Sequence, residues 1–348
     1  MQLARNFFID TAGLASRLGS VTLLDVSCCA FASAGCRRAG STAQQLNNPA
    51  RPRPRAALHS STTPPARALA PQSTWDPPGK SGRPEYDQRR IPSAVFFDID
   101  GVCDPSTPLP HMLPSAAAFS RHMAALRVSK ARPVVVYDSS GLLAAARCVF
   151  TLHAFGHPDV RLLVGGLPRW AAEGRPVETG APPAAAAPPL PEEPWALDAS
   201  MVAGLAEVRA ASAAAAAAAG GTPAPHEPLV VDARPAPRFR GEAPEPRPGL
   251  GCGHIPGSRS VPFPLLQAPS FGPLLPPAEA DAVLRAAGVD AQRPGRIILS
   301  CGSGVTAPIV WLALAAAGRR EGVAVYDGSF AEWGLPALGL PIETGPPT

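Results

Sequence analysis

The chain repeats its own landmarks at nearly equal spacing, and this duplication limits the possible folds more than any other feature. Each half contains an Ile-Pro pair, then a polar residue that ends an apolar run, then a tryptophan: Ile91, Asp138 and Trp170 in the first half, and Ile255, Cys301 and Trp333 in the second. The first two landmarks are 47 and 46 residues apart, and the last two are 32 residues apart in both halves. The spacing therefore predicts a tandem duplication of one domain.

Each half alternates short Val/Ile/Leu runs with stretches long enough for helices. This alternation is typical of an α/β domain built on a mainly parallel sheet flanked by helices. A length of 348 residues also fits two domains. We predict a first domain over 8–170, a Pro/Ala-rich linker over 171–194 and a second domain over 195–345.

The spacing also predicts an insertion in the first half. Asp232, in LVVDAR, lies 23 residues before Ile255, whereas its best counterpart, Asp25 in VTLLDVS, lies 66 residues before Ile91. The excess of 43 residues falls in 28–73, which is rich in Pro, Ala, Arg and Ser and has no sustained apolar period. Such a composition predicts a disordered loop inserted into the first domain.

An alternative interpretation treats residues 1–75 as a mitochondrial transit peptide. This stretch has eight arginines and only two acidic residues, Asp10 and Asp25, which is typical of such peptides. Cleavage after it would remove VTLLDVS from the first domain. We favour the strand with an insertion, and we expect a mitochondrial location, with the cytoplasm as the alternative.

Cys301 begins the loop that is most informative about chemistry. It ends an apolar run, and Gly302 and Gly304 precede a second apolar stretch long enough for a helix. A thiol beside a helix N-terminus and a nest of inward backbone amides is suited to be a nucleophile. The alternative is a buried small hydrophobic residue. The first half has Asp138 here, and a carboxylate is no sulfur nucleophile, so only the second domain is expected to be catalytic.

Composition and motifs argue against several other classes of protein. The net charge is only +4 and the basic residues are scattered, so nucleic-acid binding is not indicated. No apolar run approaches the roughly 20 residues of a membrane span. Seven cysteines occur without a CxxC pair and a matching His/Cys set, so neither a metal nor an organic cofactor is expected.

Ten segments together resemble the 3-mercaptopyruvate sulfurtransferases, the two-domain members of the rhodanese superfamily. In the first half they are AVFFDIDG, LPHMLPS, VVVYD, AFGH and GGLPRW, and in the second half VVDAR, RFRGEAPEPRPG, GHIPGS, SCGSGVTA and VYDGSFAEW. The resemblance covers roughly Phe8 to Pro341, apart from the insertion and the linker. It implies tandem rhodanese-like domains.

The resemblance also implies roles for individual residues. Arg238 and Arg247 match the positions that grip the substrate carboxylate and carbonyl, whereas Arg234 and Arg240 are expected to be solvated. Asp104, His111 and Ser303 match a proton relay behind the donor sulfur, which would bring the first domain to the active site. The alternative is that His111 packs a loop and Ser303 bonds only to backbone. The expected substrate-binding loop comprises Gly302, Gly304, Val305 and Thr306, with Cys301 as the nucleophile.

Side chains within this loop favour one chemistry. Phosphatases of similar fold need an arginine six residues after the cysteine, and here that position is Ala307. Thiosulfate sulfurtransferases of the family carry basic side chains where this chain has Gly302 and Ser303. A neutral loop favours monoanionic mercaptopyruvate, whose carboxylate is held elsewhere.

The expected reaction moves sulfane sulfur from 3-mercaptopyruvate to Cys301 and releases pyruvate. The Cys301 persulfide would then pass its sulfur to a thiol such as reduced thioredoxin, or to cyanide. One alternative is thiosulfate:cyanide sulfur transfer. An alternative of another class is a catalytically silent rhodanese-like binding module.

Overall fold

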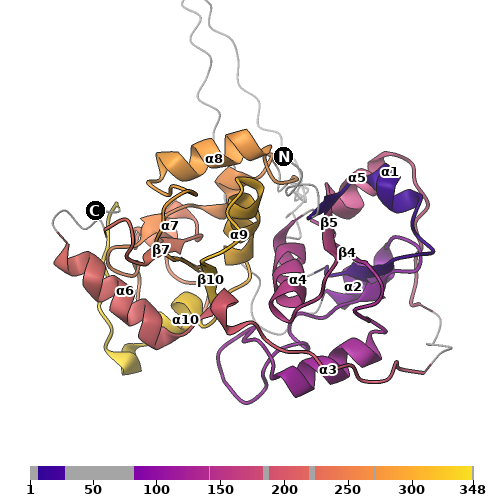
Figure 1. The fold of residues 1–348 in the computed structure, drawn as a ribbon, viewed down its shortest axis with the longest axis horizontal. Helices are drawn as coiled ribbons and strands as arrows, with labels where there is room; N and C mark the ends of the chain where they lie inside the picture. Colours follow the sequence, from indigo (N-terminus) through magenta and orange to yellow (C-terminus); the bar gives the residue numbers. More distant parts are fainter. Residues whose placement is uncertain are drawn as a thin grey trace, which may run out of the picture.

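The computed structural model describes residues 7–27, 82–140, 142–182, 188–218, 224–269 and 272–346. Within them the chain forms two α/β domains that lie side by side (Figure 1). Each contains a parallel five-stranded sheet, so the predicted fold class is confirmed. The predicted insertion 28–73 lies outside the described residues.

The first sheet has the strand order β1-β5-β4-β2-β3, and every neighbouring pair is parallel. In chain order its strands are β1 (Phe8–Ile9), β2 (Thr22–Asp25), β3 (Val95–Phe96), β4 (Val134–Tyr137) and β5 (Val160–Leu163). The helices are α1 (Thr11–Ala15), α2 (Arg83–Gln88), α3 (Ala116–Ala125), α4 (Leu143–Ala154) and α5 (Gly166–Ala172).

The second sheet repeats this topology with the order β6-β10-β9-β7-β8. Its strands are β6 (Val202–Ala203), β7 (Leu229–Asp232), β8 (Arg259–Ser260), β9 (Ile297–Ser300) and β10 (Val323–Tyr326). The helical segments are η3 (Ala199–Met201), α6 (Leu205–Ala217), α7 (Ala236–Phe239), η5 (Phe263–Leu266), α8 (Pro277–Ala286), α9 (Ala307–Ala316), α10 (Ser329–Trp333) and η6 (Pro336–Leu338).

Asp25 and Asp232 occupy the same place in the two sheets. Asp25 ends β2, which lies between β4 and β3, and Asp232 ends β7, which lies between β9 and β8. Every residue of β2 is buried, as is typical of an inner strand of a parallel sheet covered by helices on both faces. VTLLDVS therefore supplies an inner strand of the first sheet, far in sequence from β3.

The helices α4 and α9 pack against each other where the two domains meet (Figure 1). Both are apolar around almost their whole circumference, which is typical of helices buried on all sides. The rings of Phe150 on α4 and Trp311 on α9 meet edge to face with centroids 5.6 Å apart. One continuous hydrophobic core thus joins the domains, and this contact sets the first domain against the catalytic loop.

The described parts of the predicted linker lie against the first domain. Arg90 pairs with Glu178, and the Glu193 carboxylate accepts hydrogen bonds from the Ser129 hydroxyl and the Lys130 N–H at 2.6 and 3.0 Å. No helix among the described residues is long and apolar enough to cross a membrane. The four cysteines in this part of the chain are free thiols.

Candidate active site

Cys301 lies directly after β9, in the middle of the second sheet. β9 is flanked by β10 and β7, so its carboxyl end opens at the centre of the sheet edge, where parallel α/β proteins place their sites. Residues 301–306 then lead into α9. Cys301 is buried, as are Ser303, Val305 and Thr306. The predicted strand, loop and helix are thus present, with the candidate nucleophile at the bottom of the site.

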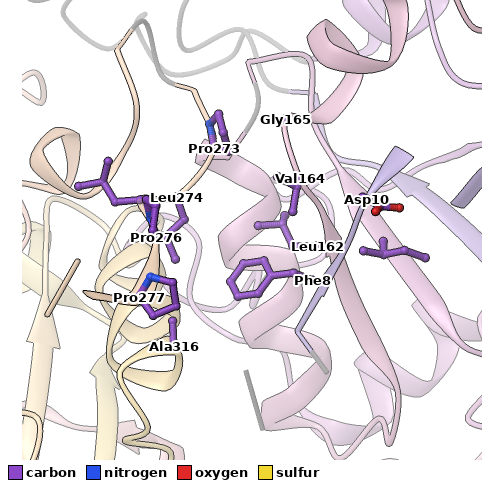
Figure 2. Close-up of a pocket in the computed structure, with 12 residues that line it drawn as sticks. Phe8, Asp10, Leu162, Val164, Gly165, Pro273, Leu274, Pro276, Pro277 and Ala316 are labelled. Carbon is purple, nitrogen blue, oxygen red and sulfur yellow. The ribbon is translucent and has the colours of Figure 1, made fainter. Parts of the chain in front are cut away.

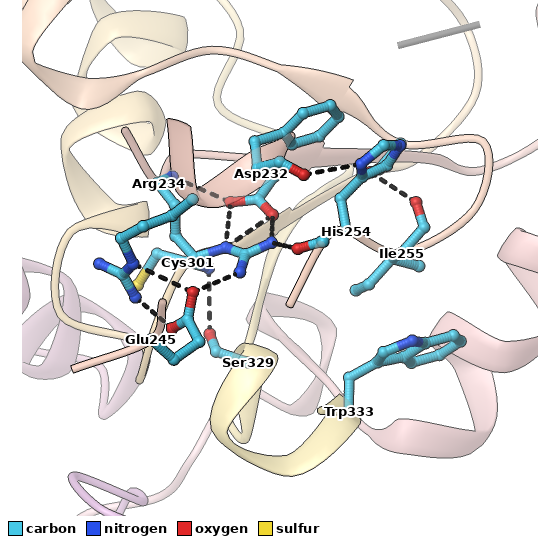
Figure 3. Close-up of polar contacts among 12 residues, drawn as sticks. Asp232, Arg234, Glu245, His254, Ile255, Cys301, Ser329 and Trp333 are labelled. Carbon is cyan, nitrogen blue, oxygen red and sulfur yellow. Dashed lines mark hydrogen bonds and ion pairs between the residues drawn. The ribbon is translucent and has the colours of Figure 1, made fainter. Parts of the chain in front are cut away.

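The start of α10 fixes the backbone of the nucleophile. The Cys301 N–H donates to the Ser329 hydroxyl over 3.2 Å (Figure 3). This hydroxyl donates to the Tyr326 carbonyl over 2.8 Å. The Cys301 carbonyl accepts from the Phe330 N–H over 3.0 Å. Ser329 has a φ of 50°, a left-handed conformation that non-glycine residues rarely adopt. Such a conformation persists where surrounding contacts over-determine it, as they do here.

His111 and Ser303 meet across the domain interface, with Nδ1 3.0 Å from Oγ. The carboxylate at the other ring nitrogen is Asp100, whose Oδ1 lies 2.9 Å from Nε2. Asp104, predicted for that place, is elsewhere: it accepts hydrogen bonds from the N–H and hydroxyl of Ser106 at 2.9 and 2.7 Å. A local turn, in which an Asp side chain bonds the backbone two residues on, occupies Asp104. Asp100 therefore replaces it behind the histidine.

The direction of proton movement follows from Asp100. The hydrogen bond from His111 holds the pKa of the Asp100 carboxyl below its usual value, and the charge of Arg247 contributes. An ionised carboxylate only accepts, so His111 carries a hydrogen on Nε2, and in the neutral ring Nδ1 is an acceptor. The Ser303 hydroxyl can therefore give a proton to His111 and take it back.

Arg238 lies against the residue that follows the nucleophile. A Cβ added at Gly302 would be 2.8 Å from Nη2 of Arg238, so glycine at this position lets the guanidinium lie directly against the loop. The guanidinium is held in a bidentate pair by Glu245, with Nε 3.0 Å from Oε1 and Nη2 in contact with Oε2. A longer side chain at position 302 would need the space that this guanidinium fills. Arg238 therefore supplies a positive charge beside a loop that has no basic side chain of its own.

Arg247 is half-buried in the same Pro-rich segment. Burial lowers the pKa of its guanidinium, while the charges of Cys301, Glu245 and Asp100 act in the opposite sense. Of the two arginines predicted to grip the substrate, Arg238 lies against the loop that begins at Cys301. Arg247 follows nine residues later in the same segment.

Arg234, expected to be solvated, is instead completely buried. Its Nε and Nη2 donate to Oδ2 of Asp232 at 2.9 and 2.6 Å, and its Nη1 donates to Glu245 over 2.8 Å (Figure 3). The guanidinium carbon lies 3.7 Å from the centre of the Phe330 ring. A buried charge needs this degree of pairing, and Arg234 obtains it two residues after β7 ends at Asp232. Arg240 lies at the surface, paired with Glu242.

Glu245 links the buried arginine to the one beside the loop, and the sequence analysis missed it. Burial raises the pKa of this carboxyl, but the hydrogen bond from Arg238 and the charges of Arg234 and Arg238 together bring it below its usual value. Glu245 is therefore ionised and shared by two cations. The available signal was its place between two arginines in RFRGEAPEPR.

The corresponding loop of the first domain contains an anion of its own. Asp138 is buried at the place of Cys301, and Leu167 donates to its carbonyl as Phe330 does to that of Cys301. The Asp138 carboxylate accepts from the N–H groups of Ser140 and Ala145 at 3.1 and 3.0 Å. The Ala145 amide lies in the first turn of α4. The Asp138 carboxylate therefore occupies the position at this helix N-terminus where an external anion would bind.

A cavity of about 600 Å³ lies between the domains, but away from this chemistry (Figure 2). Its lining is mainly apolar and includes Phe8, Leu162, Leu274 and Ala316. The charged residue in its lining, Asp10, accepts a hydrogen bond from the Gly13 N–H at the start of α1. None of the candidate site residues lines this cavity. The described residues also hold no cluster of three or more His, Cys, Asp or Glu side chains able to bind a metal.

The arrangement defines a class of protein: a two-domain rhodanese-like fold with a buried cysteine at the start of a neutral loop and the Arg238 guanidinium against that loop. The sequence profile of the Rhodanese-like domain family matches residues 81–173 and 212–335. The chain belongs to the two-domain rhodanese-like family of 3-mercaptopyruvate sulfurtransferases and is a sulfurtransferase.

Relatives from several kingdoms support this assignment. The chain is 40% identical over 271 residues to 3-mercaptopyruvate sulfurtransferase of Escherichia coli, covering 76% of this chain and 88% of the relative. It is 37% identical over 290 residues to the mitochondrial thiosulfate/3-mercaptopyruvate sulfurtransferase 1 of Arabidopsis thaliana, covering 78% and 73%. The human 3-mercaptopyruvate sulfurtransferase is 36% identical over 258 residues, covering 73% and 80%.

Solved structures agree with the fold. The E. coli 3-mercaptopyruvate sulfurtransferase SseA has a TM-score of 0.67 at 30% identity, covering 93% of this chain and 98% of that chain. The Tum1 protein of Saccharomyces cerevisiae has a TM-score of 0.70 at 25% identity, covering 96% and 95%. Both similarities extend over both domains of this chain.

Proposed function

We propose that this enzyme takes sulfur from 3-mercaptopyruvate onto Cys301, releases pyruvate and passes the sulfur to a second thiol or to cyanide. The observation that carries the proposal is the position of Arg238, whose guanidinium lies against Gly302 beside the nucleophile. A cation there suits a small anionic donor, while the neutral loop leaves room for its sulfur.

The first half-reaction is a displacement at sulfur. The Cys301 thiolate attacks the donor sulfur, an S–S bond forms and the C–S bond of the donor breaks. The bonding electrons pass to carbon 3 as an enolate, and the hydrogen of the donor thiol stays on the outer sulfur. The enolate then takes up a proton at carbon 3 and leaves as pyruvate, so Cys301 holds a persulfide.

Side chains around the loop can bind the anionic donor and exchange a proton during this step. Arg238 and Arg247 can hold the carboxylate and the oxygen that becomes the enolate through charge-assisted hydrogen bonds. Ser303, backed by His111 and Asp100, can exchange a proton beside the donor sulfur. Gly302, Gly304, Val305 and Thr306 form the rest of the substrate loop.

The second half-reaction restores the thiolate. A thiolate such as that of reduced thioredoxin, or cyanide, attacks the outer sulfur, and the electrons of the S–S bond return to Cys301. The donor and the acceptor thus react one after the other at Cys301, as in a ping-pong scheme. A mitochondrial location stays a prediction, with the cytoplasm as the alternative.

The test is steady-state sulfur transfer from mercaptopyruvate and from thiosulfate, each with cyanide as acceptor. We expect kcat/KM for mercaptopyruvate to be larger by at least ~10-fold, or about 1.4 kcal/mol of transition-state preference. A preference for thiosulfate would support the alternative donor. Absence of turnover with both donors would support the silent binding module.

Variants and a label identify the nucleophile. Cys301→Ser should abolish turnover because a hydroxyl cannot carry sulfane sulfur, whereas Cys252→Ser, at an exposed free cysteine, should leave it unchanged. After incubation with donor alone, a persulfide-specific reagent should label the wild-type protein at Cys301. Turnover by Cys301→Ser would disprove the mechanism.

A further inference from the structure

Arg147 is a buried charged residue in the otherwise apolar helix α4 of the first domain. It lies nine residues after Asp138, the residue that replaces the nucleophile in that domain. Its side chain is only 4% exposed. Burial of a guanidinium is costly unless its donors are paired, so the partners of Arg147 indicate what it does.

The hydrogen bonds of its guanidinium go to residues in or next to the candidate active site. Nη1 donates to the Gly304 carbonyl over 3.1 Å, and Nη2 donates to the His111 carbonyl over 2.6 Å and to Asp327 over 2.7 Å. The other carboxylate oxygen of Asp327 accepts the Leu113 N–H over 2.6 Å. Arg147 and Asp327 therefore connect the relay segment of the first domain to the catalytic loop of the second.

The two carbonyls that Arg147 binds belong to residues with left-handed backbone. Gly304 has a φ of 76° and His111 a φ of 61°, a conformation that is costly for histidine. A Cβ at position 304 would also lie 3.0 Å from Nη1 of Arg147. The Arg147 guanidinium thus binds two backbone segments with left-handed residues, one on each side of the His111–Ser303 contact.

We propose that Arg147 is a positioning residue that aligns His111 with Ser303 by fixing both loops at once. The proposal rests on the proposed sulfur transfer and deepens it. It also gives the first domain a task although its own loop has Asp138 instead of cysteine: α4 presents the arginine that sets the relay. A lysine could not replace it fully, since a single ammonium lacks the planar fork that reaches three acceptors.

The test compares Arg147→Ala and Arg147→Lys with Arg90→Ala. Arg90 is a matched control because it is an equally buried arginine of the first domain, 3% exposed, that pairs with Glu178 away from the site. Misplacing a catalytic group by about 1 Å can cost about 100-fold. We therefore expect kcat with mercaptopyruvate to fall roughly 10–100-fold in Arg147→Ala, with KM within about threefold, since Arg147 touches no substrate. Arg90→Ala should lower thermal stability but leave kcat of the folded protein unchanged.

Chemical rescue separates positioning from simple loss of stability. Added guanidinium at low millimolar concentration should restore several-fold activity to Arg147→Ala and none to Arg90→Ala. A folded Arg147→Ala that keeps wild-type kcat, or loses activity only in step with its unfolded fraction and without rescue, would overturn the proposal. If that variant does not fold, a folded Arg147→Lys with wild-type kcat would overturn it equally. Wild-type protein inactive with mercaptopyruvate would instead refute the proposed function.

Discussion

Nδ1 of His111 and Oγ of Ser303 lie 3.0 Å apart, although 192 residues and a domain boundary separate them in the chain. The contact exists because α4 and α9 pack together and bring the β3–α3 loop of one domain over the catalytic loop of the other. The relay is therefore a property of the pair of domains, and neither half contains it alone.

The first prediction distinguishes the two aspartates of the relay segment. Asp100→Asn should lower kcat/KM for mercaptopyruvate by roughly 10-fold or more, because His111 loses the carboxylate that fixes its hydrogen on Nε2. Asp104→Asn should change it by less than about twofold, since that carboxylate bonds only Ser106. Steady-state kinetics of both variants decide the matter, and a larger effect at Asp104 would restore the original assignment.

The second prediction concerns the arginines beside the loop. Arg238→Ala and Arg247→Ala should each weaken kcat/KM by roughly 1.5–3 kcal/mol, the range for hydrogen bonds to charged groups. Arg247→Lys should recover only part of the loss. Arg240→Ala is the matched control, because this partly exposed arginine of the same segment pairs with Glu242. Equal kinetics in all four variants would mean that Arg238 and Arg247 do not bind the donor.

Glu245 extends this prediction to the support of Arg238. Glu245→Gln keeps the size of the side chain but removes the charge shared by Arg238 and Arg234. Because the pKa of Glu245 is lowered in the folded state, its stabilising effect is present above the usual carboxyl pKa and is lost as the pH falls. The variant should therefore be less stable at neutral pH and show a weaker loss of stability on acidification. Thermal melts between neutral and acidic pH measure both effects.

Local sequence patterns were sufficient to predict the duplication, the class of fold and the loop that begins at Cys301. The apolar runs before Asp138 and Cys301 are followed at equal distance by Trp170 and Trp333, so the two halves could be matched from spacing alone. The order of the strands within each sheet is known only from the structure. Arg234 was different, because its burial depends on Glu245 and Phe330, which approach it only in the folded chain. A polar loop in sequence gave no sign of that contact.

Sequence alone also could not decide whether Asp100 or Asp104 contacts His111. Both lie in one short polar stretch before His111, and either could reach the ring by spacing alone. In the structure the Asp104 carboxylate accepts hydrogen bonds from Ser106, and Asp100 contacts Nε2 of His111. The outcome depends on backbone conformation within the loop, including the left-handed His111, which residue types do not specify.

The third prediction concerns the pH dependence of the domain interface. Burial lowers the pKa of His153 to about 4, and the buried Nε2 of its ring has no hydrogen-bond partner among the residues that the structure describes. The centroid of its ring lies 4.9 Å from that of Phe7 and 5.7 Å from that of Trp311, where α4 meets α9.

A histidine whose folded pKa lies below its unfolded value binds its proton more readily when unfolded, so stability falls as the pH drops from about 6.5 towards 4. The contribution of His153 to that fall is at most about 3 kcal/mol. His153→Phe should reduce the loss in denaturant melts across this range. Burial also lowers the pKa values of His157 and His254, so part of the loss should remain. An unchanged pH profile would show that His153 does not titrate with unfolding.

The fourth prediction concerns the amino-terminal strands. β1 and β2 belong to the first sheet, and β2 lies inside it between β4 and β3, with Leu23 and Leu24 buried. Deleting residues 29–72 keeps both strands and shortens the connection from β2 to β3 to nearly the length of the one from β7 to β8. Loop-closure entropy changes only slowly with length, so this variant should stay folded and active.

Deleting residues 1–75 removes β1 and β2 and should destabilise the first domain by several kcal/mol, because an inner strand and its buried side chains are lost. Activity should fall with it, since His111 and Arg147 are held by that domain. The transit-peptide interpretation expects the opposite, a stable and active mature enzyme. Thermal melts and mercaptopyruvate turnover of the two deletion variants compare these outcomes directly. A 76–348 protein as stable and active as the full chain would show that the first domain begins after the strand that contains Asp25.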